Sequence, residues 1–364
     1  MAKQKQLKKK GAGALGAHTD LAIPNLKLPS IHCPFPSAVS PYAEAVDQHT
    51  LAWAERHALV TGARALERLR AFKSGWLAAR AYPYAPLNRL AIVSDWNTWL
   101  FMLDDQCDEH GIGKRPERLT ALHAKCLHVL AGGRPEPQDR VTAQFPQRER
   151  RADKCIDLPL LHALDDLRER LQAIVAPDWM ARFIQRVSEY FESSVWEAEN
   201  RAHGLWPEPA TYTRMRPYTG AVYTVIELIE AAEGIALPLA VRKHPRVQRL
   251  ALITSNVVCW SNDTISLKKE HAHHDTHNLA LIFQRHYGLT IQEAVDRVAK
   301  LTEAQMRQFI ALESRMPVFG AGLDAVVRRF VAGLRAWMRG NLDWSYDSGR
   351  YGQADRAPAR HAGA

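Results

Sequence analysis

From Pro41 onward, apolar residues recur at spacings of three and four, and short breaks rich in proline and glycine divide this pattern into long stretches. Such spacing is typical of amphipathic helices that pack against one another. Alternating Val and Ile segments bounded by turns are absent, as are glycine-rich loops of the P-loop or dinucleotide-binding kind. The sequence therefore predicts an all-α protein of roughly ten helices. The predicted breaks lie near Tyr82-Pro83, Gly111-Ile112-Gly113, Gly132-Gly133-Arg134-Pro135, Ala176-Pro177, Gly204 to Pro209, His244-Pro245, Gly288 and Pro317.

No shift in composition along this pattern marks a boundary between two domains, so we expect a single domain over residues 41–351. Residues 1–40 are expected to form a disordered basic tail followed by an extended strap on the domain, because the proline-rich segment IPNLKLPSIHCPFPS has no helical periodicity. Residues 352–364 are expected to form a disordered C-terminal tail.

The first ten residues contain five lysines and no acid, and they supply more than half of the formal net charge of +9. Such tails are usually solvated, and no basic stripe interleaved with aromatic residues accompanies this one. We therefore expect no nucleic acid as a partner. No run approaches the ~20 apolar residues of a membrane span, and no signal core follows the basic start. A soluble, cytoplasmic protein with reduced cysteines is expected.

An acidic cluster ends an otherwise aromatic and apolar helical stretch, at Asp104, Asp105 and Asp108. Asp104 and Asp108 are four residues apart and therefore lie on one helical face. Carboxylates beside an apolar wall lose solvation unless cations compensate them, and Mg²⁺ prefers to bridge such carboxylates to substrate phosphates. The cluster predicts a metal site, although an acidic helix end exposed to solvent would give the same pattern.

A second constellation strengthens this interpretation. Asn262, Ser266 and Glu270 are spaced by four and four, so an amide oxygen, a hydroxyl and a carboxylate stack along one side of a predicted helix. Together they offer three oxygen ligands to one ion from within a helical bundle. The alternative is a polar stripe that faces solvent, with Lys268 and Glu270 as ordinary surface charges.

The two motifs, DDQCD and NDTISLKKE, resemble the signature pair of bacterial class I terpene synthases, whose all-α bundle surrounds a hydrophobic cavity. Two further segments extend the resemblance over about residues 31 to 351. The segment from Trp344 to Tyr351 is similar to the family's closing W-S-x-x-x-x-R-Y element, and Arg216-Pro217-Tyr218-Thr219-Gly220 is similar to its sensor, linker and effector pattern. Within the family, the chain most resembles germacrene A and selinene synthases. It departs from many relatives in having Met215-Arg216 where they carry two arginines, and Thr219 where they carry an acid.

The resemblance implies Mg²⁺-dependent ionisation of a linear prenyl diphosphate, with farnesyl diphosphate expected, followed by cyclisation of the carbocation and release of diphosphate. Three Mg²⁺ ions are implied, with Mn²⁺ as a substitute. The implied metal ligands are Asp104, Asp105, Asp108, Asn262, Ser266 and Glu270. The implied diphosphate ligands are Arg216, Lys269, Arg350 and Tyr351. The implied catalytic residues are the sensor Arg216, the linker Thr219, the effector Gly220, and the cavity aromatics Phe101 and Trp344. The family also implies a homodimer as one expected oligomeric state.

Several alternatives stay open at this stage. Geranyl or geranylgeranyl diphosphate would suit the same motifs. A chain-elongating prenyltransferase would share the fold but normally carries two aspartate-rich motifs. A non-enzymatic helical nucleic-acid-binding protein would account for the lysines. The histidines between His271 and His277 suit transition metals, although the family places a polar loop there. No motif encodes the product.

Overall fold

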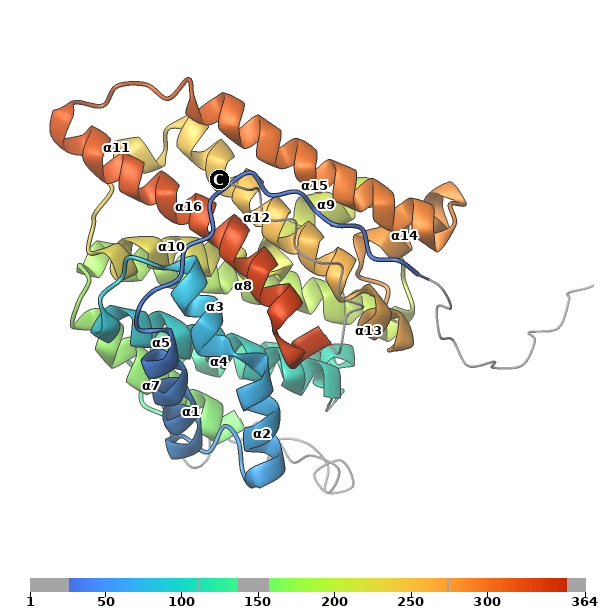
Figure 1. The fold of residues 1–364 in the computed structure, drawn as a ribbon. Helices are drawn as coiled ribbons and strands as arrows, with labels where there is room; N and C mark the ends of the chain where they lie inside the picture. The colour runs from blue at the N-terminus through green and yellow to red at the C-terminus, as the bar shows by residue number, and fades with distance from the viewer. Residues whose placement is uncertain (1–25, 110, 137–156, 274, 352–364) are drawn as a thin grey trace, which may run out of the picture.

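The computed structural model describes residues 26–109, 111–136, 157–273 and 275–351 (Figure 1). Within these ranges every α-helix or 3-10 helix is joined by turns or irregular segments, and no strand occurs. The predicted all-α class is therefore confirmed. In chain order the elements are α1 (Ala43–Arg56), α2 (Ala63–Phe72), α3 (Ser74–Ala81), α4 (Leu87–Glu109), η1 (Ile112–Lys114), α5 (Pro116–Leu130), α7 (Asp157–Gln172), α8 (Pro177–His203), α9 (Pro209–Thr219), α10 (Val222–Glu233), α11 (Leu239–Arg242), α12 (Pro245–Ile265), α13 (Leu267–Ala272), α14 (Leu279–Tyr287), α15 (Ile291–Glu313), α16 (Ala321–Asp347) and η4 (Gly349–Tyr351).

Local sequence signals explain many of the helix ends. Proline is the first residue of four helices, where its missing N–H is not needed: α5, α8, α9 and α12. The side chain of Asn278 caps α14 by accepting from the N–H groups of Ala280 and Leu281. Thr290 and Glu293 form a reciprocal capping box at the start of α15. Each predicted break separates two of the helices.

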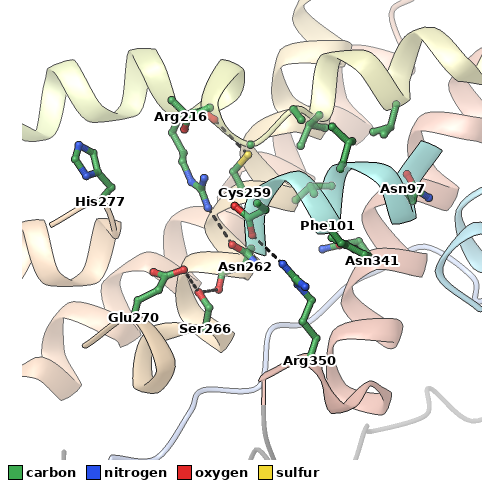
Figure 2. Close-up of a pocket in the computed structure, with 18 of the residues that line it drawn as sticks. Asn97, Phe101, Arg216, Cys259, Asn262, Ser266, Glu270, His277, Asn341 and Arg350 are labelled. Carbon is green, nitrogen blue, oxygen red and sulfur yellow. Dashed lines mark hydrogen bonds and ion pairs between the residues drawn. The ribbon is translucent and has the colours of Figure 1, made fainter. Parts of the chain in front are cut away.

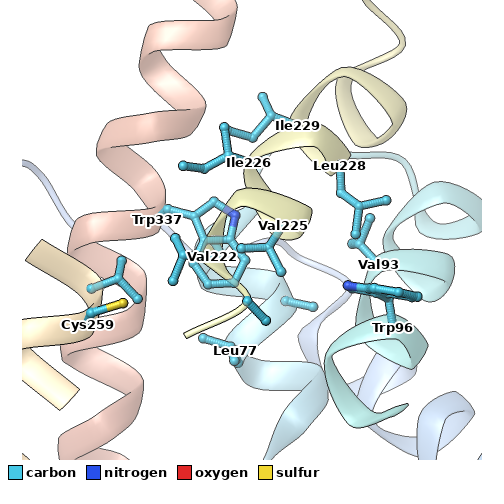
Figure 3. Packing of buried hydrophobic residues seen from close by; sticks show 14 of the residues in the cluster. Leu77, Val93, Trp96, Val222, Val225, Ile226, Leu228, Ile229, Cys259 and Trp337 are labelled. Carbon is cyan, nitrogen blue, oxygen red and sulfur yellow. The ribbon is translucent and has the colours of Figure 1, made fainter. Parts of the chain in front are cut away.

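Helix α10 lies at the centre of the bundle. Apart from Tyr223, its residues from Val222 to Ala232 are buried, so it contacts neighbours on all sides, including α4, α8, α12 and α16. Figure 3 shows its aliphatic side chains beside Trp337 of α16 and Trp96 of α4. A helix that is apolar on nearly every face is stable only in such a position. One of its faces is turned toward the cavity described below.

Residues 26–40 have no helix or strand and run across α15 and α16 before α1 begins (Figure 1). Leu26, Ile31 and Phe35 of this segment are buried, and the Phe35 ring meets the Phe309 ring of α15 edge to face at 5.5 Å between centroids. The backbone of Lys27 exchanges two hydrogen bonds with the Gln292 side chain. We call residues 26–40 the strap.

Among the described helices, none combines the length and the apolar character that crossing a membrane would need.

Candidate active site

A cavity lies between α4, α8, α9, α10, α12 and α16, and its residues divide into two groups (Figure 2). Carboxylates, amides and cations gather where α4, α12 and α16 end. Farther from these ends the lining is mainly apolar, with Leu77, Val222, Val225, Val258 and Trp337. The polar lining residues named by the sequence analysis are Asp104, Arg216, Thr219, Asn262, Ser266, Lys269, Glu270, Arg350 and Tyr351; Phe101, Gly220 and Trp344 also line the cavity.

The acids at the end of α4 have different surroundings. Asp104 lines the cavity and its side chain is 53% exposed. Asp105 is buried, does not line the cavity, and pairs with Arg350 and Arg68, each at 3.3 Å. Burial raises the pKa of the Asp105 carboxyl, and the charge of Arg350 opposes that shift. Asp108 belongs to α4, but its side chain lies outside the part of the chain that the structure describes.

The three oxygen-bearing residues of the second motif converge on the cavity, but they do not lie on one continuous helix as the spacing predicted. Helix α12 ends at Ile265 and α13 begins at Leu267, so Ser266 is the junction between them. Ser266 keeps helical torsions, and its N–H still donates to the carbonyl of Asn262 at 2.8 Å. The four-residue spacing therefore survives the junction.

Contacts inside the second motif hold its ligand atoms in place. The Ser266 hydroxyl lies 2.7 Å from a Glu270 carboxylate oxygen, and the Asn278 amide donates to the other oxygen at 2.7 Å. Burial raises the pKa of Glu270, with further contributions from Asp263 and Asp275. A buried carboxylate surrounded by other acids gains most from a bound cation, so the oxygen donors here fit a divalent metal ion.

Asp263 positions Arg216 and Tyr212 next to the second motif, a role that was not predicted from the sequence. Its buried carboxylate accepts from Arg216 Nε at 2.9 Å and from the Tyr212 hydroxyl at 2.9 Å. The Asn262 side-chain oxygen accepts from Arg216 Nη2 at 2.9 Å. Burial alone would lower the pKa of Arg216, but the Asp263 carboxylate raises it well above its usual value. The position of Asp263 directly after Asn262 within the NDTISLKKE segment was the available signal.

A break between α9 and α10 lies at the cavity wall. Helix α9 ends at Thr219, Ala221 adopts the left-handed region with φ +56°, and α10 begins at Val222. Gly220 stands between them, where an added Cβ would lie 2.5 Å from the Cys259 sulfur. The glycine is therefore required by the close approach of α12.

The end of the described chain connects the two acidic motifs. Arg350 of η4 donates to Asp104 at 2.8 Å, and the Asn262 amide donates to the Tyr351 hydroxyl at 2.8 Å. The Arg350 guanidinium also lies over the Phe101 ring, 4.4 Å from its centroid. In this arrangement a cationic side chain sits directly beside the exposed carboxylate of Asp104.

Aromatic rings close the cavity below this connection. Phe101 stacks on Trp344 with 5.4 Å between centroids, and Trp344 Nε1 donates to the Phe72 carbonyl at 2.8 Å. Trp96 and Trp99 of α4 are fully buried in the core and do not line the cavity. Tyr190 and Trp337 line it but were not predicted, because helical spacing does not say which buried face borders a cavity.

A further polar network borders the cavity beside α13. Arg201 of α8 pairs with Asp275 at 3.0 Å and with Glu197 at 3.3 Å. Burial raises the pKa of Asp275, but the charge of Arg201 and hydrogen bonds to the carboxylate lower it by more. The pKa of this carboxyl is therefore held well below its usual range. His277 donates its backbone N–H to Asp275. Among the described side chains, no three His, Cys, Asp or Glu residues come together as a transition-metal site.

A helical bundle around an apolar cavity, with oxygen ligands and cations at its polar end, defines an enzyme of the class I terpene synthase type. The model of terpene synthase family 2, C-terminal metal binding, matches residues 95–308, which include both acidic motifs. The chain belongs to this terpene synthase family. The predicted family and enzyme class are therefore confirmed, and the prenyltransferase and nucleic-acid-binding alternatives are set aside.

Individual relatives agree with this assignment over most of their length. The chain is 41% identical to (+)-T-muurolol synthase of Roseiflexus castenholzii, covering 87% of this chain and 92% of the relative. It is 34% identical to germacrene A synthase of Nostoc punctiforme, covering 91% and 97%. Among solved structures, a variant of cucumene synthase superposes with a TM-score of 0.73 at 30% identity, covering 88% of this chain and 99% of that chain.

Proposed function

We propose that this chain ionises farnesyl diphosphate with the help of Mg²⁺ and cyclises the resulting carbocation to a cyclic sesquiterpene. The observation that carries the proposal is the link at the polar end of the cavity, where η4 joins Asp104 to Asn262 through Arg350 and Tyr351. The (+)-T-muurolol synthase relative is described as cyclising farnesyl diphosphate, which supports the choice of substrate.

The metal ligands in this proposal are Asp104, Asn262, Ser266 and Glu270, with Asp108 as a further carboxylate at the end of α4. Asp105, which the sequence analysis included, is proposed instead to hold Arg350 through their 3.3 Å ion pair. Bound Mg²⁺ supplies Lewis-acid stabilisation of the charge that develops on the leaving diphosphate. We expect three ions, with Mn²⁺ as a substitute.

The protein's own cations complete the diphosphate site. Arg216, Lys269 and Arg350 line the polar end of the cavity and donate charge-assisted hydrogen bonds to phosphate oxygens. The Tyr351 hydroxyl contributes a further donor. Arg350 would exchange its present partner Asp104 for a diphosphate oxygen.

Ionisation breaks the bond between the allylic carbon and the ester oxygen, and both electrons leave with diphosphate. The Phe101 and Trp344 rings face the place where the cation forms, and each ring attracts a cation by roughly 0.5 to 2 kcal/mol. We propose that Thr219 and Gly220 place the backbone of the α9–α10 break against the same region. The apolar remainder of the cavity folds the isoprenoid chain for ring closure.

Incubation of the purified protein with geranyl, farnesyl and geranylgeranyl diphosphates, followed by gas chromatography and mass spectrometry, tests the proposal. Cyclic products from farnesyl diphosphate are expected with Mg²⁺ and none with EDTA. Asn262→Ala is expected to lower kcat at least about a hundredfold, since it removes a group that acts on developing charge. Asn256→Ala is the matched control, because Asn256 lies on the same helix, donates a hydrogen bond to Gln305 and does not line the cavity.

Linear alcohols alone from all three substrates would contradict the proposal. Light scattering of the same preparation measures whether the chain is the homodimer that we propose.

A further inference from the structure

Two buried asparagines interrupt the apolar part of the cavity wall. Asn97 of α4 and Asn341 of α16 both line the cavity, and they are only 2% and 7% exposed. The side-chain nitrogen of each is buried and has no hydrogen-bond partner among the described residues. Neither residue belongs to the motifs that hold metal or diphosphate.

The two asparagines lie at one level of the cavity. Helices α4 and α16 both run toward the polar end, where Asp104 meets Arg350, and one step deeper Phe101 stacks on Trp344. Asn97 precedes Phe101 by four residues and Asn341 precedes Trp344 by three, so both amides lie about one helical turn deeper than the stacked rings. Figure 2 shows Asn97 and Asn341 on the same side of the cavity as Phe101.

The part of the cavity beside Asn97 and Asn341 would hold the isoprenoid chain of the substrate rather than its diphosphate. Asn97 is seven residues before Asp104, which corresponds to about 10 Å along the helix axis. A farnesyl chain carries no hydrogen-bonding atom beyond its diphosphate, so the substrate cannot satisfy either amide. Buried amides without partners are uncommon and are usually satisfied by an ordered water molecule where the site is polar enough.

We propose that Asn97 and Asn341 hold a water molecule in the cavity, and that this water captures the final carbocation, so that the product is a cyclic sesquiterpene alcohol. The inference rests on the proposed function. The water oxygen donates a lone pair to the cationic carbon and a carbon–oxygen bond forms. The resulting oxonium loses one proton, which passes to the released diphosphate directly or through further cavity water. Farnesyl diphosphate and one water thus give one alcohol and one protonated diphosphate.

Hydrogen bonds from two amides orient the water and keep it from attacking early. The orphan nitrogen of each amide donates to one lone pair of the water oxygen, so two asparagines suit a single water molecule, and one of these hydrogen bonds is released when that lone pair attacks the cationic carbon. The reaction is then quenched only when ring closure has brought the cationic carbon to this level.

Product analysis in water enriched in the heavy oxygen isotope tests the inference. The wild-type protein is expected to convert farnesyl diphosphate mainly to a cyclic alcohol that carries the heavy isotope. Asn97→Leu and Asn341→Leu keep the side-chain size and remove the hydrogen bonds. Each is expected to lower the ratio of alcohol to hydrocarbon by about two- to tenfold, the effect of losing one ordinary hydrogen bond to the reacting water. Asn256→Leu is the control, since it removes a buried amide that does not line the cavity, and its ratio is expected to match the wild type.

The outcomes separate this inference from the proposed function. Cyclic hydrocarbons without alcohol from the wild-type protein would overturn the inference and leave the proposed function standing, as would an unchanged ratio in both leucine variants. No cyclic product from farnesyl diphosphate would overturn both. If the leucine variants do not fold, a crystal structure with Mg²⁺ and inorganic diphosphate decides the point. Water within hydrogen-bonding distance of both amides supports the inference, and the absence of ordered water between Asn97 and Asn341 contradicts it.

Discussion

Arg216 illustrates how a single side chain connects separate parts of the site. It extends from α9 to α12, where it binds the carboxylate of Asp263 and the amide oxygen of Asn262. A buried ion pair adds little net stability, but removing one partner leaves the other charge uncompensated, which costs about 3 to 5 kcal/mol. Arg216 therefore positions a proposed metal ligand as well as facing diphosphate.

Replacing Arg216 with lysine tests this positioning role. Arg216→Lys keeps the charge opposite Asp263 but loses the forked geometry, so the free energy of unfolding is expected to fall by about 1 to 3 kcal/mol. Urea denaturation followed by circular dichroism measures the change. Arg214→Lys on the exposed face of the same helix is the control, and we expect it to change stability by less than about 0.5 kcal/mol. Equal effects of the two substitutions would contradict the role given to Arg216.

We expect His123 to make folding sensitive to acid. It is buried between α5 and α8 and stacks on Phe191 at 3.9 Å between centroids. Burial lowers the pKa of His123 from the ordinary value of 6.5 to about 3. As pH falls below 6.5 the unfolded chain binds a proton that the folded chain does not, so stability contributed by the neutral ring is present above that pH and lost below it.

The His123→Leu variant measures this contribution. Between pH 7.5 and pH 5.5, the wild type is expected to lose about 1.4 kcal/mol more unfolding free energy than the variant. Urea denaturation at both pH values gives the comparison, with His162→Leu on the exposed face of α7 as the control. A variant as acid-sensitive as the wild type would show that another group carries the effect.

At the scale of elements, the sequence located helices better than it located the junctions between them. Proline and glycine marked most breaks because they act through local backbone chemistry. The junction at Ser266 escaped prediction, since its torsions remain helical and neither proline nor glycine marks it. The Gly220 break was inferred from resemblance, whereas its physical requirement, contact with Cys259, is visible only in three dimensions.

The α9–α10 break gives a prediction at this scale. Gly220→Ala would place a methyl group against the Cys259 sulfur, and we expect it to destabilise the fold by about 1 to 3 kcal/mol. Cys259→Ala in the same chain should relieve most of this loss, because the two changes share one space. A double-mutant cycle in urea measures the coupling. Gly322→Ala, where a Cβ meets nothing within 4 Å, is the control. If the stability changes of Gly220→Ala and Cys259→Ala simply add in the double variant, the close contact between positions 220 and 259 is refuted.

At the scale of the whole molecule, the strap joins the outer surfaces of α15 and α16. Phe35 packs on Phe309, and the Ser37 hydroxyl donates to Asp343 at 2.7 Å. These partners are far apart in sequence, so the strap contributes to stability only when the bundle is complete.

Phe35→Ala tests the importance of the strap. Truncating this buried ring is expected to cost about 3 to 5 kcal/mol, since a cavity remains beside Phe309. Val39→Ala, in an exposed position of the same segment, is expected to change stability by less than about 0.5 kcal/mol. A change in urea midpoint for Val39→Ala as large as that for Phe35→Ala would argue against specific packing of the strap.

The sequence by itself determined the helical class, most helix ends and the two acidic motifs, because these depend on spacing and on residue chemistry along a few turns. The metal-ligand positions predicted at 104, 262, 266 and 270 all line one cavity. Only the tertiary structure decided which neighbours of those residues face the cavity. Asp105 turns to Arg350, Asp263 holds Arg216, and Asn97 and Asn341 reach the cavity from helices more than two hundred residues apart. These outcomes depend on how distant helices pack, and no local pattern records that packing.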